Sequence, residues 1–240
     1  MTKLVPRIQQ AFEEARKGGR DYLLEPEAKA VCIERGIPCA RFLLARNIDE
    51  AIKSAESIGY PVVLKIVSPS ILHKSDVGGV VTDVRNVAQL RASYRDILAN
   101  VKKQMPDVEI TGMLVEEMIP PSTEVVVGAT KNSQFGSVIM FGLGGVFVEI
   151  LKDVSFRAAP IDANDALEMI TELRAYSILK GYRNRPPADI DALIDILLRV
   201  STLVVEYPEI GEIDLNPILS SGEGTKVVDA RILLGVPSKA

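Results

Sequence analysis

The chain has 240 residues, of which 47% are hydrophobic and 25% are charged, with a formal net charge of -4 and a pI of about 5.3. This composition is typical of a globular protein and argues against a disordered chain. Because the charge balance is slightly acidic, it provides no overall attraction to nucleic acid or to an anionic membrane, and we expect neither as a partner. An anionic ligand would need a local group of cations and backbone amides.

The two cysteines, Cys32 and Cys39, are too few for a four-ligand zinc site without nearby histidines. We expect them to be reduced thiols in or near a core. Residues 1–11 lack the apolar core of a signal peptide. The longest apolar stretch, 138–148, contains three glycines and is too short to span a bilayer. The sequence therefore predicts a cytoplasmic protein.

Hydrophobic spacing, caps and turn residues predict helices and strands in mixed order along the chain. In the first half, we expect helices at 6–16, 26–36, 47–59 and 86–104, and strands at 41–45, 61–67, 80–84 and 111–118. In the second half, we expect strands at 124–129, 137–141, 146–150, 155–159, 212–219 and 226–230, and helices at 163–174 and 188–206. Because the strands are clustered, the sequence predicts an α+β protein of two lobes, each with a mostly antiparallel or mixed sheet and flanking helices.

Lys65 interrupts the otherwise apolar strand 61–67. A buried ammonium group needs a partner, because removing it from water alone is costly. Two interpretations stay open from the residues. Lys65 could reach solvent at the strand end, or it could bind a nucleotide phosphate.

His73 is the only histidine of the chain and lies in the polar segment 68–76, just before Gly78 and Gly79. Neutral imidazole is a good nucleophile near neutral pH, so any histidine chemistry must use this residue. The hydroxyl groups and backbone amides of such a loop can hold phosphate oxygens. A solvated loop side chain without a function is the alternative.

A glycine cluster, Gly142-Leu143-Gly144-Gly145, lies between two predicted strands. Such a cluster is typical of a tight hairpin, or of backbone that closely approaches a ligand. It has neither the Rossmann spacing nor the lysine and hydroxyl residue of a P-loop.

Acidic residues lie on both sides of Pro120-Pro121. Glu116 and Glu117 end a strand before the prolines, and Glu124 follows them. The two prolines restrict the backbone and suit a connector between lobes. A carboxylate beyond such a connector can accept hydrogen bonds from ribose hydroxyls. The alternative is that these are exposed acids on a bend without a function.

The last polar group lies near the C-terminus. The period of two in a strand places Glu212, Asp214 and Asn216 on one face. Asp229 lies on the next predicted strand, which a hairpin could bring alongside. Hard oxygen ligands of this kind suit Mg²⁺, while a solvated strand face is the alternative.

Taken in order, these segments resemble an ATP-grasp domain over about residues 20–235. Within that superfamily they resemble the β subunits of ADP-forming acetyl-CoA synthetases, which are related to those of succinyl-CoA synthetases. The matching segments are 27–29 with 36–38, 61–65, 114–116 with Glu124, and 214–217 with Asp229. The resemblance implies an ATP-grasp fold, with a nucleotide between a larger lobe of residues 1–40 and 118–240 and a smaller lobe of residues 41–117.

The resemblance also implies the site residues. It implies nucleotide binding by Lys65, by the hinge residues Glu116, Glu117 and Met118, and by Glu124 at the ribose. It implies Mg²⁺ ligands at Asn216 and Asp229, with Asp214 at or next to the metal. Succinyl-CoA synthetases carry a glycine- and arginine-rich loop where this chain has His73, and that departure implies a phosphohistidine at His73. Arg157 is expected to approach the phosphates.

The implied activity is phosphoryl transfer between this phosphohistidine and ADP or ATP with Mg²⁺. Acetyl-CoA, ADP and phosphate would give acetate, CoA and ATP together with an α subunit that carries the CoA-binding and ligase domains, in an α₂β₂ hetero-oligomer. Two alternatives remain. One is a self-contained ATP-grasp ligase that joins a carboxylate to an amine, and the other is a nucleotide-binding regulatory subunit without turnover.

Overall fold

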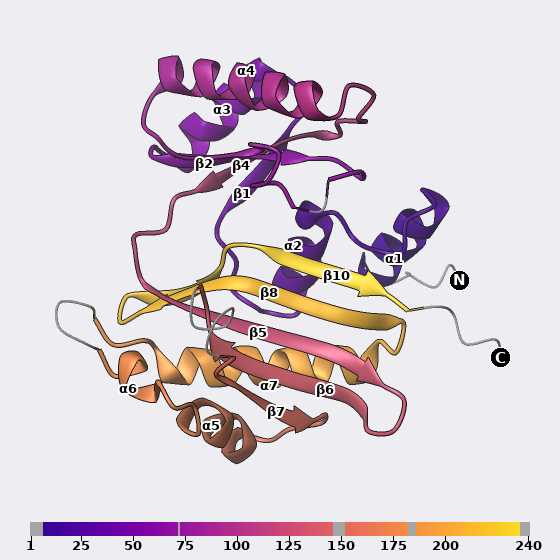
Figure 1. Ribbon diagram of the computed structural model, residues 1–240, viewed down its shortest axis with the longest axis vertical. Coiled ribbons are helices and arrows are strands. Elements are labelled where there is room, and N and C mark those ends of the chain that lie inside the picture. The colour runs from indigo at the N-terminus through magenta and orange to yellow at the C-terminus, as the bar shows by residue number, and fades with distance from the viewer. Residues whose placement is uncertain (1–6, 72, 146–151, 182–185, 236–240) are drawn as a thin grey trace, which may run out of the picture. The chain divides into compact units, whose positions relative to one another are not determined.

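The structure is a computed structural model that describes residues 7–71, 73–145, 152–181 and 186–235. The chain divides into two compact units (Figure 1). Unit 1 comprises Met1–Cys39 and Pro121–Ala240, and unit 2 comprises Ala40–Pro120. The sequence predicts lobe boundaries after residues 40 and 117. These positions lie close to the two points at which the chain passes from one unit to the other.

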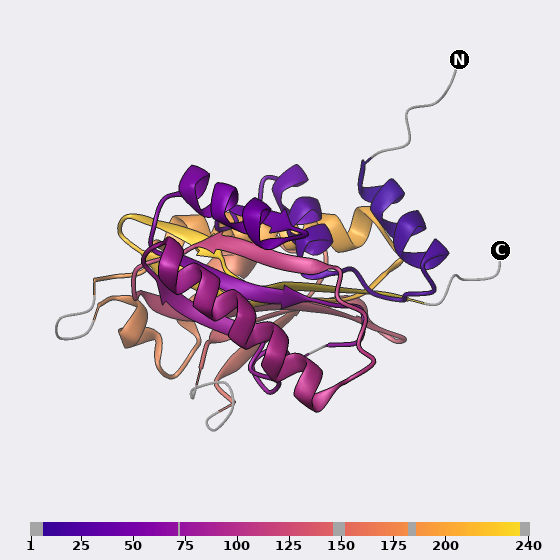
Figure 2. The ribbon, with the colours of Figure 1, turned by 90° about the horizontal axis from the view of Figure 1, so that it is seen from above.

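Unit 2 is a four-stranded antiparallel sheet with two helices on one face. The strands follow the order β1-β4-β2-β3. Their bounds are β1 Phe42–Ala45, β2 Val62–Val67, β3 Val80–Val84 and β4 Gly112–Glu117, and those of the helices are α3 Ile48–Ile58 and α4 Val87–Gln104. Figure 2 shows this unit from above, with both helices on the near side of the sheet. All six residues of β2 are buried, which explains why all of them except Lys65 are apolar.

Asparagine caps start both helices of unit 2. The Asn47 side chain accepts a hydrogen bond from the Glu50 backbone N–H, and Asn86 accepts one from Gln89. Each cap satisfies one of the backbone donors that a helix N-terminus leaves without an intrahelical partner.

Unit 1 has a larger antiparallel sheet of order β10-β8-β5-β6-β7, with β9 paired to β8. Its strands are β5 Thr123–Asn132, β6 Gly136–Leu143, β7 Val154–Ala158, β8 Ile210–Ser221, β9 Gly224–Val227 and β10 Ala230–Leu234. Its helices are α1 Arg7–Lys17, α2 Glu25–Glu34, α5 Ala163–Thr171, α6 Tyr176–Leu179 and α7 Ile190–Glu206. The segment before α2 hydrogen-bonds along β10, where the Leu23 N–H donates to the Ile232 carbonyl at 2.9 Å.

The two faces of this sheet differ in character. On the face that packs against α7, which we call the helix face, Val127, Ile139 and Ile213 join one buried cluster with Leu193 and Leu197 of α7. Side chains alternate along each strand, so the intervening residues lie on the opposite face, which we call the pocket face. The core therefore fixes which residues are available for function.

Most predicted elements are confirmed, and all pairs between the named strands of the described residues are antiparallel. The single strand predicted at 226–230 is wrong, because β9 and β10 divide this region between them. Asp229 lies in the link between these two strands. The short helix α6 was also not predicted. The strand predicted at 146–150 lies outside the described residues.

No helix in the described parts of the chain combines the length and apolarity needed to cross a membrane.

Candidate functional site

Lys65 lies in the middle of β2 and pairs with Glu116 of the neighbouring strand β4. Its Nζ is 3.1 Å from Glu116 Oε1, and the two side chains are 6% and 0% exposed. The interpretation of Lys65 as a lysine that reaches solvent is therefore wrong. A buried cation beside a buried carboxylate is held in one place, which suits a charge that must meet a phosphate.

Glu117 and Met118 follow Glu116 at the end of β4. The Glu117 carboxylate accepts hydrogen bonds from the Arg41 backbone N–H at 2.8 Å and from Arg41 Nε at 2.9 Å. The Met118 N–H donates to the Pro61 carbonyl at 3.3 Å. These contacts fix the course of the backbone where the chain leaves unit 2.

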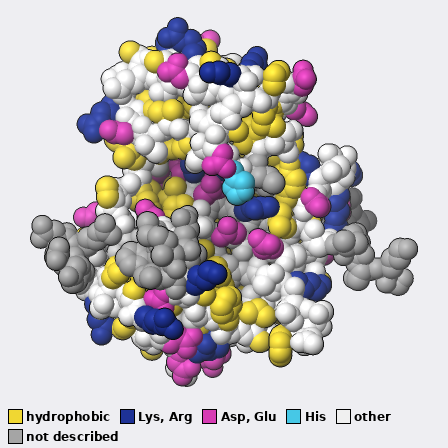
Figure 3. All heavy atoms as spheres, in the orientation of Figure 1, with side chains coloured by type: hydrophobic (Ala, Val, Ile, Leu, Met, Phe, Trp, Pro, Cys, Tyr) yellow, Lys and Arg dark blue, Asp and Glu magenta, His cyan; other side chains and the backbone are white. Residues whose placement is uncertain are grey.

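His73 lies exposed in the loop between β2 and β3, and it is the cyan side chain in Figure 3. Beyond it the loop is closed by a hydrogen bond of 2.7 Å from the Gly79 N–H to the Lys74 carbonyl. A Cβ atom at Gly79 would lie 2.5 Å from Ile66 Cγ2 and 2.8 Å from this carbonyl, so only glycine fits there. The loop thus presents the imidazole to solvent from a closely packed base.

The glycine cluster lies next to Glu124. Glu124 is exposed near the start of β5, and its carbonyl accepts a hydrogen bond of 2.7 Å from the Gly144 N–H. A Cβ atom at Gly144 would come within 2.9 Å of Glu124 Cβ. Within the described residues, this close approach is made to the backbone and side chain of Glu124, and the approach of the cluster to a ligand stays a prediction.

A cavity of about 340 Å³ lies on the pocket face of unit 1. One end is polar, with Glu212, Asp214 and Asn216 of β8, as the period of two predicted. The other end is apolar, with side chains that include Met140 and Phe156.

The strand registers explain this shape. Phe156 pairs with Met140, Met140 with Gly128, Gly128 with Asp214, and Asp214 with Arg231, which forms one row across five strands. Gly128 has no side chain, and the Met140 side chain reaches over it, so that a Cβ atom at Gly128 would lie 3.2 Å from Met140 Cε. No sequence pattern placed Gly128, Phe156 and Arg231 in one row with Asp214, because only the strand register brings them together.

Of the predicted metal ligands, Asp214 and Asn216 line the polar end, and the backbone of Asp229 lies beside them. The Asn216 N–H donates to the Asp229 carbonyl at 3.2 Å, so the link between β9 and β10 runs beside β8. Burial is the main cause that raises the pKa of the Asp214 carboxyl above its ordinary value of 3.8. The charges of Glu212 and Asp229 raise this pKa further, and Arg231 lowers it.

This concentration of negative charge fits a divalent cation. The described residues contain no group of three or more His, Cys, Asp or Glu side chains arranged as metal ligands. Mg²⁺ does not need such a cage, because it commonly keeps several waters and binds one or two carboxylates together with substrate phosphates. Asp214 and Asn216 at the end of the cavity, with Asp229 close enough to affect the pKa of Asp214, are therefore a suitable donor set.

The raised pKa of Asp214 predicts a pH effect on the metal-free protein. The native state binds the proton of Asp214 more readily than the unfolded state, so the stability from this group is lost as pH rises through the raised pKa. Asp214→Asn removes the ionisation. We expect the variant to melt above the wild type in EDTA at neutral pH, with the difference shrinking in acid. Melting curves from about pH 4 to about pH 8 measure this, and a difference that is constant over this range would refute it.

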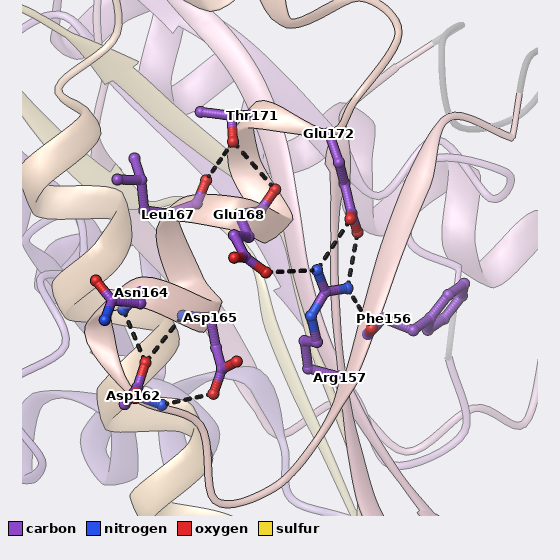
Figure 4. Close-up of polar contacts among 9 residues, drawn as sticks. All are labelled: Phe156, Arg157, Asp162, Asn164, Asp165, Leu167, Glu168, Thr171 and Glu172. Atoms are coloured by element: carbon purple, nitrogen blue, oxygen red, sulfur yellow. Dashed lines mark hydrogen bonds and ion pairs between the residues drawn. The ribbon is translucent and has the colours of Figure 1, made fainter.

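Arg157 is separated from these residues by the sheet. It pairs with Ile139 across β6 and β7, which places it on the helix face, whereas its neighbour Phe156 lines the cavity. Figure 4 shows its guanidinium held by two acids of the helix α5 segment. Glu172 binds it through two hydrogen bonds of 2.9 Å, and Glu168 through one of 3.4 Å. Arg157 therefore lies on the face opposite the cavity, and its approach to the phosphates stays a prediction.

A family model of the ATP-grasp domain matches residues 14–234. The chain is 49% identical over 230 residues to the β subunit of acetate–CoA ligase (ADP-forming) I of Pyrococcus furiosus, covering 96% of this chain and 99% of that protein. It is 51% identical over 218 residues to acetate–CoA ligase (ADP-forming) I of Archaeoglobus fulgidus, but there it covers only 31% of the relative.

The fold matches that of solved relatives. An acetyl-coenzyme A synthetase 1 chain of Ca. Korarchaeum cryptofilum, in complex with coenzyme A and Ca-AMPCP, is 48% identical, with a TM-score of 0.93 over 95% of this chain and 99% of that one. Another structure of that enzyme contains Mg-AMPPCP and is described as having its phosphohistidine segment pointing towards the nucleotide binding site. It is 44% identical, with a TM-score of 0.84 over 95% of this chain and 100% of that one.

The family match, the near-complete coverage of the Pyrococcus furiosus β subunit and the shared fold agree. The chain belongs to the ATP-grasp family and, within it, to the family of β subunits of ADP-forming acetate–CoA ligases.

Proposed function

We propose that this chain is the nucleotide-binding β subunit of an ADP-forming acyl-CoA synthetase, and that it transfers a phosphoryl group between His73 and ADP or ATP. The exposed His73 carries the proposal. It is the only imidazole of the chain, and it lies in a family in which a relative has a phosphohistidine segment that points towards its nucleotide site.

In phosphoryl transfer, a protein mainly positions the reacting groups and neutralises the negative charge of the phosphates. In the proposed site, the Lys65 ammonium binds phosphate oxygens, and the chain's Glu124 carboxylate accepts hydrogen bonds from ribose hydroxyls. The backbone at 116–118 binds the adenine edge. The contacts of Glu117 with Arg41 and of Met118 with Pro61 support this assignment, because they fix the backbone at the strand end.

Mg²⁺, when bound, neutralises negative charge on the phosphate oxygens. Asn216 and Asp229 would hold it, with Asp214 beside them. Their proximity in unit 1 and the raised pKa of Asp214 support this assignment, since a cation would relieve the repulsion among these carboxylates.

The step itself is a substitution at phosphorus. A ring nitrogen of neutral His73 forms a bond to the γ-phosphorus of ATP, the bond from this phosphorus to the bridging oxygen breaks, and ADP leaves. The reverse step returns the phosphoryl group from phosphohistidine to ADP. The neutral imidazole provides the lone pair in the first direction.

We further propose that the chain acts with an α subunit that carries the CoA-binding and ligase domains, in an α₂β₂ hetero-oligomer. Acetyl-CoA, ADP and phosphate would then give acetate, CoA and ATP. The naming of the Pyrococcus furiosus relative as a β subunit supports the partner, as does the Archaeoglobus fulgidus relative, in which the matched part is 31% of one longer protein.

Asp229→Asn is expected to raise the Mg²⁺ concentration needed for half-maximal phosphoryl transfer, because a charged oxygen ligand becomes a neutral one. A Mg²⁺ titration at saturating nucleotide measures this. Glu223→Gln is the matched control, since Glu223 is an exposed acid in the β8–β9 turn and loses the same charge. Equal titration curves for the two variants would remove Asp229 from the metal site.

Incubation with γ-labelled ATP and Mg²⁺, with and without the α subunit, tests the function. We expect label on the protein that is labile in acid and stable in base, and that is chased into ATP by ADP. A self-contained carboxylate–amine ligase would not need a labelled histidine, and a regulatory subunit would bind nucleotide without exchange. Absence of protein-bound label under all these conditions would refute the proposal.

A further inference from the structure

Arg231 of β10 lies beside the carboxylates of the proposed metal site but has no role in the function proposed above. It stands directly opposite Asp214 in the antiparallel pairing of β10 with β8. Residues in such a position have their Cβ atoms about 4.5–5.5 Å apart, so both side chains leave the same face of the sheet. The neighbours of Arg231 along β10, Ala230 and Ile232, are buried in the same core cluster as Ile213. Arg231 therefore lies on the pocket face, next to the polar end of the cavity.

The guanidinium group of Arg231 has donors to spare. Its Nε is buried and has no hydrogen-bond partner. Among the residues that the structure describes, the Arg231 side chain forms neither a hydrogen bond nor an ion pair. It does not pair even with Asp214, although the two residues face each other across the strands. A buried donor that has lost its water and gained no acceptor costs free energy, so the arrangement indicates a ligand that supplies the acceptor.

The proposed Mg²⁺ ligands lie one step further along the same two chain segments. Asn216 follows Asp214 by two residues, and Asp229 precedes Arg231 by two residues. The Asn216 N–H donates to the Asp229 carbonyl at 3.2 Å, so the two segments are still adjacent at that step. Two residues of extended chain span about 6.5–7 Å. A phosphate bound to a cation at Asn216 and Asp229 would therefore lie within the length of an arginine side chain from Arg231.

We propose that Arg231 binds the outer phosphates of the nucleotide, through hydrogen bonds from its guanidinium group to oxygens of the β- or γ-phosphate. This inference rests on the proposed function and adds a phosphate-binding residue on β10 to it. A guanidinium group holds its donors in a planar fork that matches two phosphate oxygens, and it stays charged at neutral pH. Its charge also offsets the repulsion between the phosphates and the neighbouring carboxylates of Glu212 and Asp214.

Calorimetry on the full chain tests this with two probes, a non-hydrolysable ATP analogue and AMP, each in saturating Mg²⁺ and in EDTA. Arg231→Met should bind the ATP analogue roughly 10- to 100-fold more weakly than the wild type under both conditions, because a charged hydrogen bond is lost. AMP has no β- or γ-phosphate, so its affinity should change by less than about threefold, which also shows that the variant is folded. Arg174→Met removes an exposed arginine between α5 and α6 and is the matched control, which should bind both probes like the wild type.

The Asp214→Asn variant separates phosphate binding from a purely structural role of Arg231. If Arg231 acted only by neutralising or positioning Asp214, Arg231→Met would cause no further loss in the Asp214→Asn background. Because we infer a direct contact with phosphate, we expect a similar loss of affinity for the ATP analogue in both backgrounds. Arg231→Lys should recover part of the affinity, since an ammonium group keeps the charge but not the planar fork.

Four results would overturn the inference: unchanged affinity of Arg231→Met for the ATP analogue, an equal loss for AMP, a loss confined to Mg²⁺, or a loss that vanishes in the Asp214→Asn background. Failure of the proposed function gives a different result. If the wild type bound the analogue but His73 took no label, phosphoryl transfer would be refuted while the role of Arg231 would stand. If the wild type bound neither probe, the proposed nucleotide site and this inference would be refuted together.

Discussion

His73→Asn is expected to lower phosphoryl transfer by on the order of 10³-fold or more, because removal of a nucleophile removes the covalent route altogether. Asparagine keeps a polar side chain of similar size, and His73 is exposed, so the fold should be unaffected. The measurement is the acid-labile, base-stable label that the protein takes from γ-labelled ATP. Label and ATP formation should disappear together, while Mg-ADP binding should stay within about threefold.

Ser75→Ala provides a matched control, since Ser75 is an exposed residue of the same loop. It should keep the label, which separates loss of the imidazole from disturbance of the loop. If His73→Asn retained the acid-labile label, His73 would have no covalent role. Loss of ATP formation in both variants would assign the effect to the loop.

Lys65→Met is expected to have two separate effects, because Lys65 is both half of a buried ion pair and the proposed phosphate ligand. The first effect is on stability. It leaves Glu116, which is 0% exposed, without the ammonium 3.1 Å away. Breaking a buried pair from one side costs about 3–5 kcal/mol, which urea unfolding measures. The second effect is on binding, where a charged hydrogen bond of about 1.5–3 kcal/mol corresponds to roughly 10- to 100-fold weaker ADP binding.

The double variant Lys65→Met/Glu116→Gln distinguishes the two effects. It removes both charges, so most of the stability should return, while ADP binding measured by calorimetry should stay weak. Lys53→Met, on the exposed surface of α3, controls for the loss of a lysine and should change stability by no more than about 0.5 kcal/mol. If the double variant bound ADP like the wild type, Lys65 would be a structural residue only.

The polar residues near the C-terminus show which parts of the site the period of two in a strand can predict. The period of two correctly placed Glu212, Asp214 and Asn216 on one face, because side chains alternate along any strand. A predicted hairpin, and not this period, suggested that Asp229 could come alongside; the Asn216 N–H does donate to the Asp229 carbonyl, although Asp229 lies in the link between β9 and β10. The period could not place Arg231 or Gly128 beside Asp214, since register across strands depends on the packing of the whole sheet.

For Arg157, the local sequence pattern did not predict the face of the sheet on which the side chain lies. The sequence marked it as a possible phosphate ligand, but the same alternation that lines the cavity with Phe156 turns Arg157 to the helix face. The acids that hold it come from the region of α5, which lies more than ten residues further along the chain. No local pattern contains that information, because it requires knowing which face of β7 the helices cover.

The sequence by itself determined most helices and most strands and the division into two lobes, because propensity, capping and alternation are local properties. Only the tertiary structure decided that Lys65 is buried against Glu116, that Gly128 and Arg231 pair with Asp214, and that Arg157 lies on the helix face. Each of these depends on contacts between segments that a local pattern does not specify. Burial and pairing follow from how the segments pack together, and packing is a property of the folded chain.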